Sequence, residues 1–240
     1  MDKTRNATGR DRGSHRTTAT QIEKGNIDMG CRIIMLGTAI ALGAMAGASV
    51  AQESDATYVA DLVPLNAAAA GSEAGGTATL TVSGDTLAIK VDATGIPPGI
   101  MHLQHFHGFA EGDQAARCPA ADADANGDGI IDLIETEPFA GTTMVPFHAD
   151  PSSMAIVADS YPTAGEDGAY DYEQTVSLAA LEEAFGAAFP GQKLDLERRV
   201  IFLHGVPESP ALPDTVQSLG DVPAHVTLPI ACGEIRKADG

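Results

Sequence analysis

The chain has 240 residues and a formal net charge of −19, with 33 acidic and 14 basic side chains. It contains no tryptophan and few other aromatic residues. A surface this acidic repels the phosphates of nucleic acids and anionic lipid headgroups. The low aromatic content leaves no evident platform on which bases or sugars could stack. The composition therefore argues against nucleic acid as a partner.

The N-terminal part differs in composition from the rest of the chain. Residues 1–28 are polar and basic with almost no large apolar side chains, which predicts either a disordered extension or a start assigned too far upstream. In residues 29–51, a short basic region, an uncharged run from Ile33 to Val50 and small residues before Gln52 have the layout of a cleaved signal peptide. The alternative is an uncleaved membrane anchor, because a run of this length can just span a bilayer.

Residues 52–240 would then form the exported protein, in the periplasm or outside the cell and free of the membrane. This part is long enough for one domain with its own core. It holds seven basic and 29 acidic residues, a net charge of −22. It also retains Cys118 and Cys232. Two cysteines in an exported chain most simply form one disulfide, and the alternative is a pair of buried thiols.

The predicted elements are mostly strands. A first strand is expected over residues 56–66, and two alternating runs around Gly84 and Asp85 predict a hairpin over 77–83 and 86–92. A Gly- and Pro-rich turn at 95–99 then leads to a strand with several histidines. After it comes a long acidic insertion.

The second half is predicted to contain one helix and two strands. Helical spacing of apolar residues, Ser177 as the N-cap and Pro190 as the stop predict a helix over 177–189. Strands are expected over 199–204 and 224–232. Short strands, tight turns and a single helix predict an all-β domain, an antiparallel Greek-key β-sandwich or barrel.

Three of the seven histidines lie close together, at His102, His105 and His107. Alternate side chains of a strand share a face, so His105 and His107 are expected to point the same way, about 7 Å apart, with His102 facing away. A His-x-His pair on one face suits copper or zinc. The alternative is an ordinary strand whose histidines bind nothing.

The acidic insertion contains a second candidate metal site, at residues 124–135 (the acidic loop). Its pattern matches a twelve-residue EF-hand calcium loop, with Gly129 at the sharp turn. The predicted calcium ligands are Asp124, Asn126, Asp128, the carbonyl of Ile130, Asp132 through a water, and Glu135. A single loop without a second copy or two long flanking helices is expected to bind weakly, with a dissociation constant of about 10⁻⁴–10⁻³ M. The alternative is a chance match in an acidic loop.

Four segments, in the same order along the chain, resemble copper/zinc superoxide dismutases. They are the His-x-x-His-x-His of 102–107, the Gly-Asp-x-x-x-x-Cys of 112–118, the strand 199–204 ending in histidine, and the Ile-Ala-Cys-Gly of 230–233. The resemblance spans about 94–235. It implies an eight-stranded Greek-key barrel, a Cys118–Cys232 disulfide, copper on His105, His107 and His204 as the catalytic centre, and a structural role for His102.

The sequence departs from that family at three points. The acidic loop stands where the family has its zinc-binding loop, so a copper site without zinc is the conservative expectation. Only His148 could stand for the histidine that bridges the two metals, and whether it is a copper ligand stays open. Pro229 occupies the place of an arginine that guides the substrate anion. His225 is either a further imidazole ligand or a surface residue.

The hairpin, the Gly-rich turn and the His-x-His pair also resemble chordin-like (CHRD) domains, which are exported β-sandwiches. That resemblance implies a non-catalytic protein, with structural or metal-storing histidines and calcium that stabilises the fold. His204 and the Ile-Ala-Cys-Gly ending favour the dismutase-like alternative, whereas the missing zinc ligands and arginine favour lost activity. On balance we favour the first resemblance, which implies an exported, copper-dependent enzyme that converts superoxide, a small-molecule substrate, to O₂ and peroxide.

Overall fold

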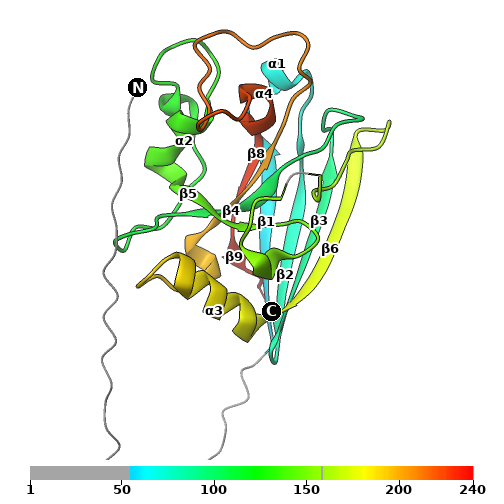
Figure 1. Cartoon of the computed structure of the whole chain (residues 1–240). Coiled ribbons are helices and arrows are strands. Elements are labelled where there is room, and N and C mark those ends of the chain that lie inside the picture. Colours follow the sequence, from blue (N-terminus) through cyan, green and yellow to red (C-terminus); the bar gives the residue numbers. More distant parts are fainter. Residues whose placement is uncertain (1–54, 158, 240) are drawn as a thin grey trace, which may run out of the picture. The chain divides into compact units, whose positions relative to one another are not determined.

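The computed structural model describes residues 55–157 and 159–239 (Figure 1). The predictions made for residues 1–28 and for a signal peptide at 29–51 lie outside these ranges. Within them, no helix combines the length and the apolar character that a membrane crossing requires.

The described part of the chain is mostly β-structure. Nine strands form one curled antiparallel sheet in the order β5-β4-β7-β8-β1-β2-β3-β6, with the short β9 paired to β1. The strands are β1 (Ala56–Pro64), β2 (Gly75–Ser83), β3 (Thr86–Thr94), β4 (Gln104–Gly108), β5 (Thr142–Pro146), β6 (Ala169–Ser177), β7 (Val200–His204), β8 (Pro229–Glu234) and β9 (Arg236–Lys237). The predicted β-rich, antiparallel class is confirmed.

The helices are few and short. They are α1 (Ala67–Ala70), α2 (Leu133–Ala140), α3 (Leu178–Ala188) and α4 (Ala224–Thr227), with 3₁₀ turns η1 (Ala121–Ala123), η2 (Pro151–Ser153) and η3 (Leu196–Arg198). Figure 1 shows α1 and α4 at the same end of the sheet and α3 toward the other end.

The first strand, the hairpin and the long helix are confirmed. In the hairpin, β2 pairs with β3 along its whole length, and the turn closes where Ser83 faces Thr86. The helix α3 begins after Ser177, whose hydroxyl accepts a hydrogen bond from the backbone N–H of Ala180 at 3.2 Å. The carboxylate of Asp85, in the hairpin turn, accepts another from Ala179 at 2.9 Å. The turn thus helps to hold the start of the helix.

The predicted strand over 224–232 is wrong in its first half. Residues Ala224–Thr227 form the one-turn helix α4, which follows Pro223 and closes with a hydrogen bond from Leu228 N–H to the Ala224 carbonyl at 2.9 Å. The strand β8 begins only at Pro229, opposite His204 in β7. Pairing with β7, rather than the local apolar alternation, sets where this strand starts.

Strands β4, β7 and β8 are buried on both faces. On β7, Ile201 and Leu203 point into the main core, which also contains Phe106 and Phe147. Val200 and Phe202 point to the opposite face and belong to a second, smaller cluster. The remaining members of that cluster are Leu65, Ala116, Ala123, Ile131, Ala140 and Cys232. The acidic insertion therefore covers the outer face of these strands and gives it a core of its own.

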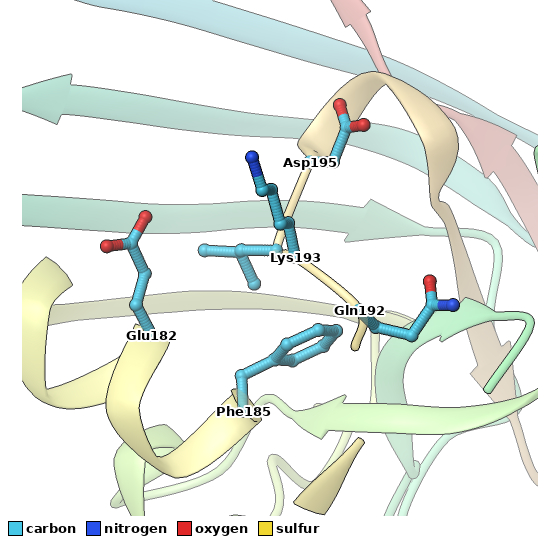
Figure 2. A pocket seen from close by; sticks show the side chains of 6 residues that line it. Glu182, Phe185, Gln192, Lys193 and Asp195 are labelled. Atoms are coloured by element: carbon cyan, nitrogen blue, oxygen red, sulfur yellow. The ribbon is translucent and has the colours of Figure 1, made fainter. Parts of the chain in front are cut away.

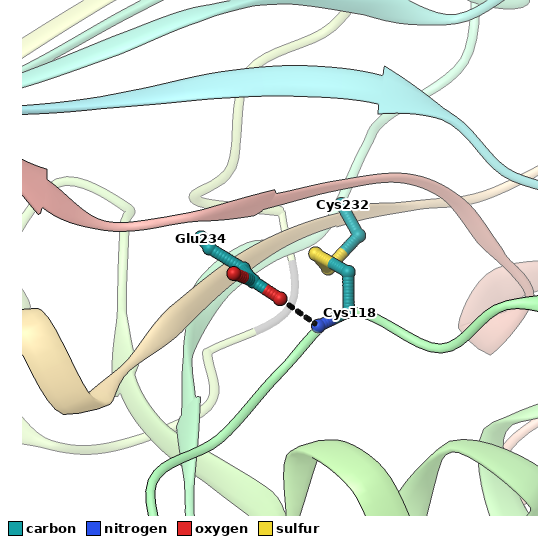
Figure 3. The surroundings of a disulfide bond; sticks show 3 residues. All are labelled: Cys118, Cys232 and Glu234. Atoms are coloured by element: carbon teal, nitrogen blue, oxygen red, sulfur yellow. Dashed lines mark hydrogen bonds between the residues drawn. A yellow bond between two sulfur atoms is a disulfide. The ribbon is translucent and has the colours of Figure 1, made fainter.

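The insertion is fastened to the sheet by the predicted disulfide, which is confirmed. Cys118, in the insertion, bonds to Cys232 of β8, with a Cα–Cα separation of 5.8 Å. The backbone N–H of Cys118 also donates a hydrogen bond to the Glu234 carboxylate at 3.1 Å (Figure 3). The two cysteines are 114 positions apart, and closing a loop of that length contributes about 4–5 kcal/mol of stability in the chain-entropy treatment.

Candidate metal centre

Three histidines from two adjacent strands meet on the outer face of the sheet. His105 and His107 lie on β4, and His204 is the last residue of β7. In the antiparallel register His105 is opposite Phe202 and His107 is opposite Val200, so both face the same way as Phe202. His204 is two residues beyond Phe202 and shares that face. Strand pairing thus assembles residues almost a hundred positions apart.

The three side chains, called here the histidine trio (His105, His107 and His204), form a compact donor set. One nitrogen of each lies within 4.8 Å of one nitrogen of both others. Across the described ranges, it is the one group of three or more His, Cys, Asp or Glu side chains with this convergence. The ring centroids are 4.8–5.7 Å apart, and the side chains are 4 %, 1 % and 1 % exposed, respectively.

Hydrogen bonds leave nitrogen lone pairs free within the trio. Nδ1 of His204 is 2.7 Å from the carbonyl of Thr227, which accepts its proton and therefore leaves Nε2 as the lone-pair nitrogen. That Nε2 and Nδ1 of His105 are both buried without a hydrogen-bond partner in the described structure. Nδ1 of His107 lies 3.4 Å from the Gly141 carbonyl, and its Nε2 lies 3.3 Å from the Thr143 hydroxyl.

Burial keeps the trio uncharged. Removal from water, with a smaller contribution from the neighbouring His204, lowers the pKa of His107 to about 3. Removal from water also lowers the pKa of His204 to about 4. The pKa of His105 is also well below its usual value, first because of burial and then because of the other histidines around it. The imidazoles are thus neutral at neutral pH, which is the form that binds a metal.

His102 lies outside the trio, but strand periodicity is not the reason, because it precedes β4, which begins at Gln104. It is fully buried, with Nδ1 3.0 Å from the His204 carbonyl and Nε2 2.8 Å from the Pro97 carbonyl. It therefore ties the turn before β4 to the end of β7, where His204 is placed. This is a supporting role.

His148 and His225 also lie outside the trio. Nε2 of His148 donates to the Ala155 carbonyl at 2.6 Å, and Nδ1 accepts the backbone N–H of Asp150 at 3.0 Å. Both nitrogens hold its own loop, so His148 would have to give up one of these bonds to bind a metal. His225 is half-buried on α4.

Tyr161 borders the trio and was missed by the sequence analysis. Its ring stands edge-on to His105 and to His148, with centroid separations of 6.3 and 5.2 Å. Its hydroxyl is buried without a hydrogen-bond partner among the described residues, and burial raises the pKa of that hydroxyl. No sequence signal marks this residue, since only the path of the loop brings it to β4.

The acidic loop is closed by hydrogen bonds to its own backbone. The carboxylate of Asp124 accepts the N–H groups of Gly127, Asp128 and Gly129 at 2.8–3.2 Å. Asn126 and Asp128 each accept one more such bond, at 2.8 Å. Gly129 has a positive φ of 84°, as the sharp turn requires.

The end of the acidic loop is also the start of a helix. Asp132 and Glu135 form a reciprocal capping box at the N-terminus of α2, each side chain accepting the other's backbone N–H at 3.0 Å. The other carboxylate oxygen of Glu135, Oε1, accepts the N–H groups of Ala125 and Asn126 at 2.8 and 3.1 Å. Among the loop's side-chain oxygens in the described structure, Oδ2 of Asp128 alone is buried without a hydrogen-bond partner. The predicted calcium residues share one hydrogen-bonded loop, but no three of their carboxylates converge as the nitrogens of the trio do, and most of their side-chain oxygens already accept hydrogen bonds.

A separate groove runs between α3 and residues 192–195 (Figure 2). Its walls carry Glu182, Lys193 and Asp195, and Phe185 forms part of its floor. Nearby, the buried guanidinium of Arg199 donates to the carbonyls of Leu194 and Lys193 at 3.1 and 2.5 Å. The charges on the walls are of both signs and offer no convergent donor set comparable to the histidine trio.

Comparison of the sequence with models of known protein families gave no match, and comparison with curated proteins found no similar sequence. The function therefore has to be argued from the residues and from the geometry of the site.

Proposed function

We propose that this protein is an exported copper-binding protein of the superoxide dismutase-like class that converts superoxide to O₂ and peroxide. The observation that carries the proposal is the histidine trio, in which buried nitrogens of His105 and His204 have no hydrogen-bond partner in the described structure. A buried polar atom left without a partner costs about 1–3 kcal/mol, and a bound metal would relieve that cost.

The donor chemistry favours copper. Three neutral imidazoles suit both Cu(I) and Cu(II), and three protein ligands leave a coordination position for a small molecule. Zinc accepts the same three imidazoles, but a site of this kind generally binds Cu(II) more tightly than Zn(II). The proposed copper ligands are therefore His105, His107 and His204, with His148 as a ligand only if its loop rearranges.

The sheet order agrees with the proposed barrel class in one respect: β1, β2 and β3 are successive neighbours, and the late strand β8 lies beside the early strand β1. The chain reaches β8 only after β4, β5, β6 and β7, so the Greek-key topology itself is part of the proposal. The Cys118–Cys232 disulfide agrees with export, since such bonds persist in oxidising compartments.

When bound, copper would supply the one-electron chemistry by which two superoxide ions and two protons give O₂ and hydrogen peroxide. The chain's own residues position the three imidazoles, keep them uncharged and exclude bulk water from them. The Tyr161 ring packs edge-on against His105.

The acidic loop is proposed to bind calcium through Asp124, Asn126, Asp128, the carbonyl of Ile130, Asp132 and Glu135. The positive φ of Gly129 and the unpartnered Oδ2 of Asp128 support this. Carboxylate and carbonyl oxygens are the ligands that calcium prefers.

The second candidate function is a non-catalytic, CHRD-like metal-binding domain. Three observations favour it. The histidines are almost fully buried, which restricts substrate access, and Pro229 stands where the resemblance calls for a guiding arginine. With a net charge of −22 after residue 51, general attraction of an anion is also absent.

The test is metal content and superoxide dismutation, measured on one purified sample of the protein. We expect stoichiometric copper and dismutation, and we expect both to be lost in His105→Gln and His204→Gln. His225→Gln is the matched control, because that histidine lies outside the trio. Copper without dismutation would favour the non-catalytic alternative. Dismutation that survives both trio substitutions would contradict the proposal.

A further inference from the structure

We infer that Asp132, Ser218 and Thr227 are positioning residues that hold the His204 imidazole in its ligand orientation and couple it to the end of the acidic loop. The inference rests on the proposed function only in taking His204 as a metal ligand. Its structural part concerns hydrogen bonds that exist without any metal.

The first link joins His204 to Thr227. The carbonyl of Thr227 lies 2.7 Å from Nδ1 of His204 and fixes both the tautomer and the ring orientation. Thr227 is the last residue of α4, a helix of four residues. A single turn is not stable on its own, so something else must hold this carbonyl in place.

The second link joins Thr227 to the preceding segment. The hydroxyls of Thr227 and Ser218 are 2.7 Å apart, and Thr227 is 7 % exposed. Residues 205–223 contain turns but no helix or strand. The Ser218 hydroxyl therefore fastens α4 to an irregular segment, which needs an anchor of its own.

The third link supplies that anchor. Oδ2 of Asp132 accepts the backbone N–H of Gln217 at 2.7 Å, while its Oδ1 caps α2 through the N–H of Glu135. Asp132 is fully buried. A buried carboxylate that accepts two N–H groups from distant segments fixes both of them, because charged hydrogen bonds are stronger than neutral ones.

A parallel link runs through Asn66. Its side chain accepts the N–H of Ile131 and donates to the Ile131 carbonyl, both at 2.8 Å, and it also donates to the carbonyl of Pro229 at 2.9 Å. The last residues of the acidic loop therefore contact the chain on both sides of Thr227. If these loop residues become less ordered, the hydrogen bonds that hold the His204 ring in place are weakened.

Two substitutions break this chain of contacts. Thr227→Val removes the hydroxyl and keeps the shape of the side chain. Asp132→Asn leaves an acceptor for only one of the two N–H groups. The first matched control is Thr227→Ser, which keeps the hydroxyl. The second is Asp85→Asn, which removes the negative charge from a side chain that accepts a hydrogen bond at the start of a different helix, α3.

The measurements are the NMR signal of the His204 Nδ1–H in the metal-free full-length protein and its affinity for Cu(II) by chelator competition. In Thr227→Val and Asp132→Asn we expect the Nδ1–H signal to shift or broaden and Cu(II) affinity to fall about tenfold, as for other groups that orient metal ligands. In both controls we expect neither change.

Unchanged Nδ1–H signals and Cu(II) affinity in Thr227→Val and Asp132→Asn would overturn the inference. Equal effects in Asp85→Asn would also overturn it, because they would show general destabilisation. If the wild-type protein takes up no Cu(II), the proposed function fails, and the NMR measurement on metal-free protein still decides the inference.

Discussion

The histidine trio and the acidic loop are both candidate metal sites, but they are built in opposite ways. The trio draws on two paired strands, is almost fully buried and leaves nitrogens of His105 and His204 without hydrogen-bond partners in the described structure. The acidic loop is a local stretch of chain whose carboxylates already accept the N–H groups of Gly127, Gly129 and other loop residues.

This difference determines what each site gains from a metal. In the trio, the sheet holds the donor nitrogens in place whether or not a metal is present. Without a metal, the buried nitrogens that lack hydrogen-bond partners raise the free energy of the folded protein. In the acidic loop, backbone N–H groups already donate hydrogen bonds to most of the carboxylate oxygens. The loop can therefore fold without a metal, and calcium binding adds less to its stability. We therefore expect a tight site in the sheet and a weak one in the loop.

The largest effect that distinguishes the two sites is the pH dependence of stability in the metal-free protein. The pKa of His107 is about 3 and that of His204 about 4 in the fold, against an ordinary value of 6.5. Below pH 6.5 the unfolded chain takes up protons that the folded chain refuses. The free energy of unfolding should therefore fall as the pH falls from 6.5 toward 4, by up to about 1.4 kcal/mol per pH unit for each imidazole.

Denaturant unfolding of the metal-free protein at pH 7, 6 and 5 measures this slope. His204→Gln should make it shallower, because one of the protonating groups is gone, whereas Asp124→Asn in the acidic loop should leave it unchanged between pH 7 and 5. Parallel curves for wild type and His204→Gln would show that the His204 imidazole does not resist protonation in the fold.

The sequence predicted the pair His105 and His107 on one strand better than it predicted how His204 joins them. The shared face of His105 and His107 follows from strand periodicity, which is local. The place of His204 depends on the pairing of β4 with β7, which periodicity cannot reveal, and only the family resemblance brought that residue forward. Tyr161 could not be found at all, since its position depends on a loop.

Two other differences have identifiable causes. The strand expected over 224–232 begins late, because α4 forms ahead of it and β8 starts only where it meets β7. The Asp-x-x-Glu spacing of Asp132 and Glu135 fits a helix capping box as well as two calcium ligands, and only the calcium ligands were predicted. The structure shows the capping box, which makes these two residues structural in the metal-free protein.

A smaller effect is expected from calcium. If the acidic loop binds with a dissociation constant of about 10⁻³ M, then 10 mM Ca²⁺ should raise the free energy of unfolding by about 1.4 kcal/mol. The gain is modest because the loop is already closed by Asp124 and Glu135 before calcium arrives. Thermal unfolding with and without Ca²⁺ measures it, with Mg²⁺ at the same concentration as the control for ionic strength and charge.

Asp124→Ala and Asp132→Ala sharpen this last prediction, because the two residues play different parts in the loop. Asp124 accepts only N–H groups of the loop itself, so its loss should abolish the calcium effect at a small cost in stability. Asp132 is buried, caps α2 and holds Gln217, so its loss should destabilise the protein even without calcium. A calcium effect that persists in Asp124→Ala would place the calcium elsewhere and leave the loop as a purely structural cover for β4, β7 and β8.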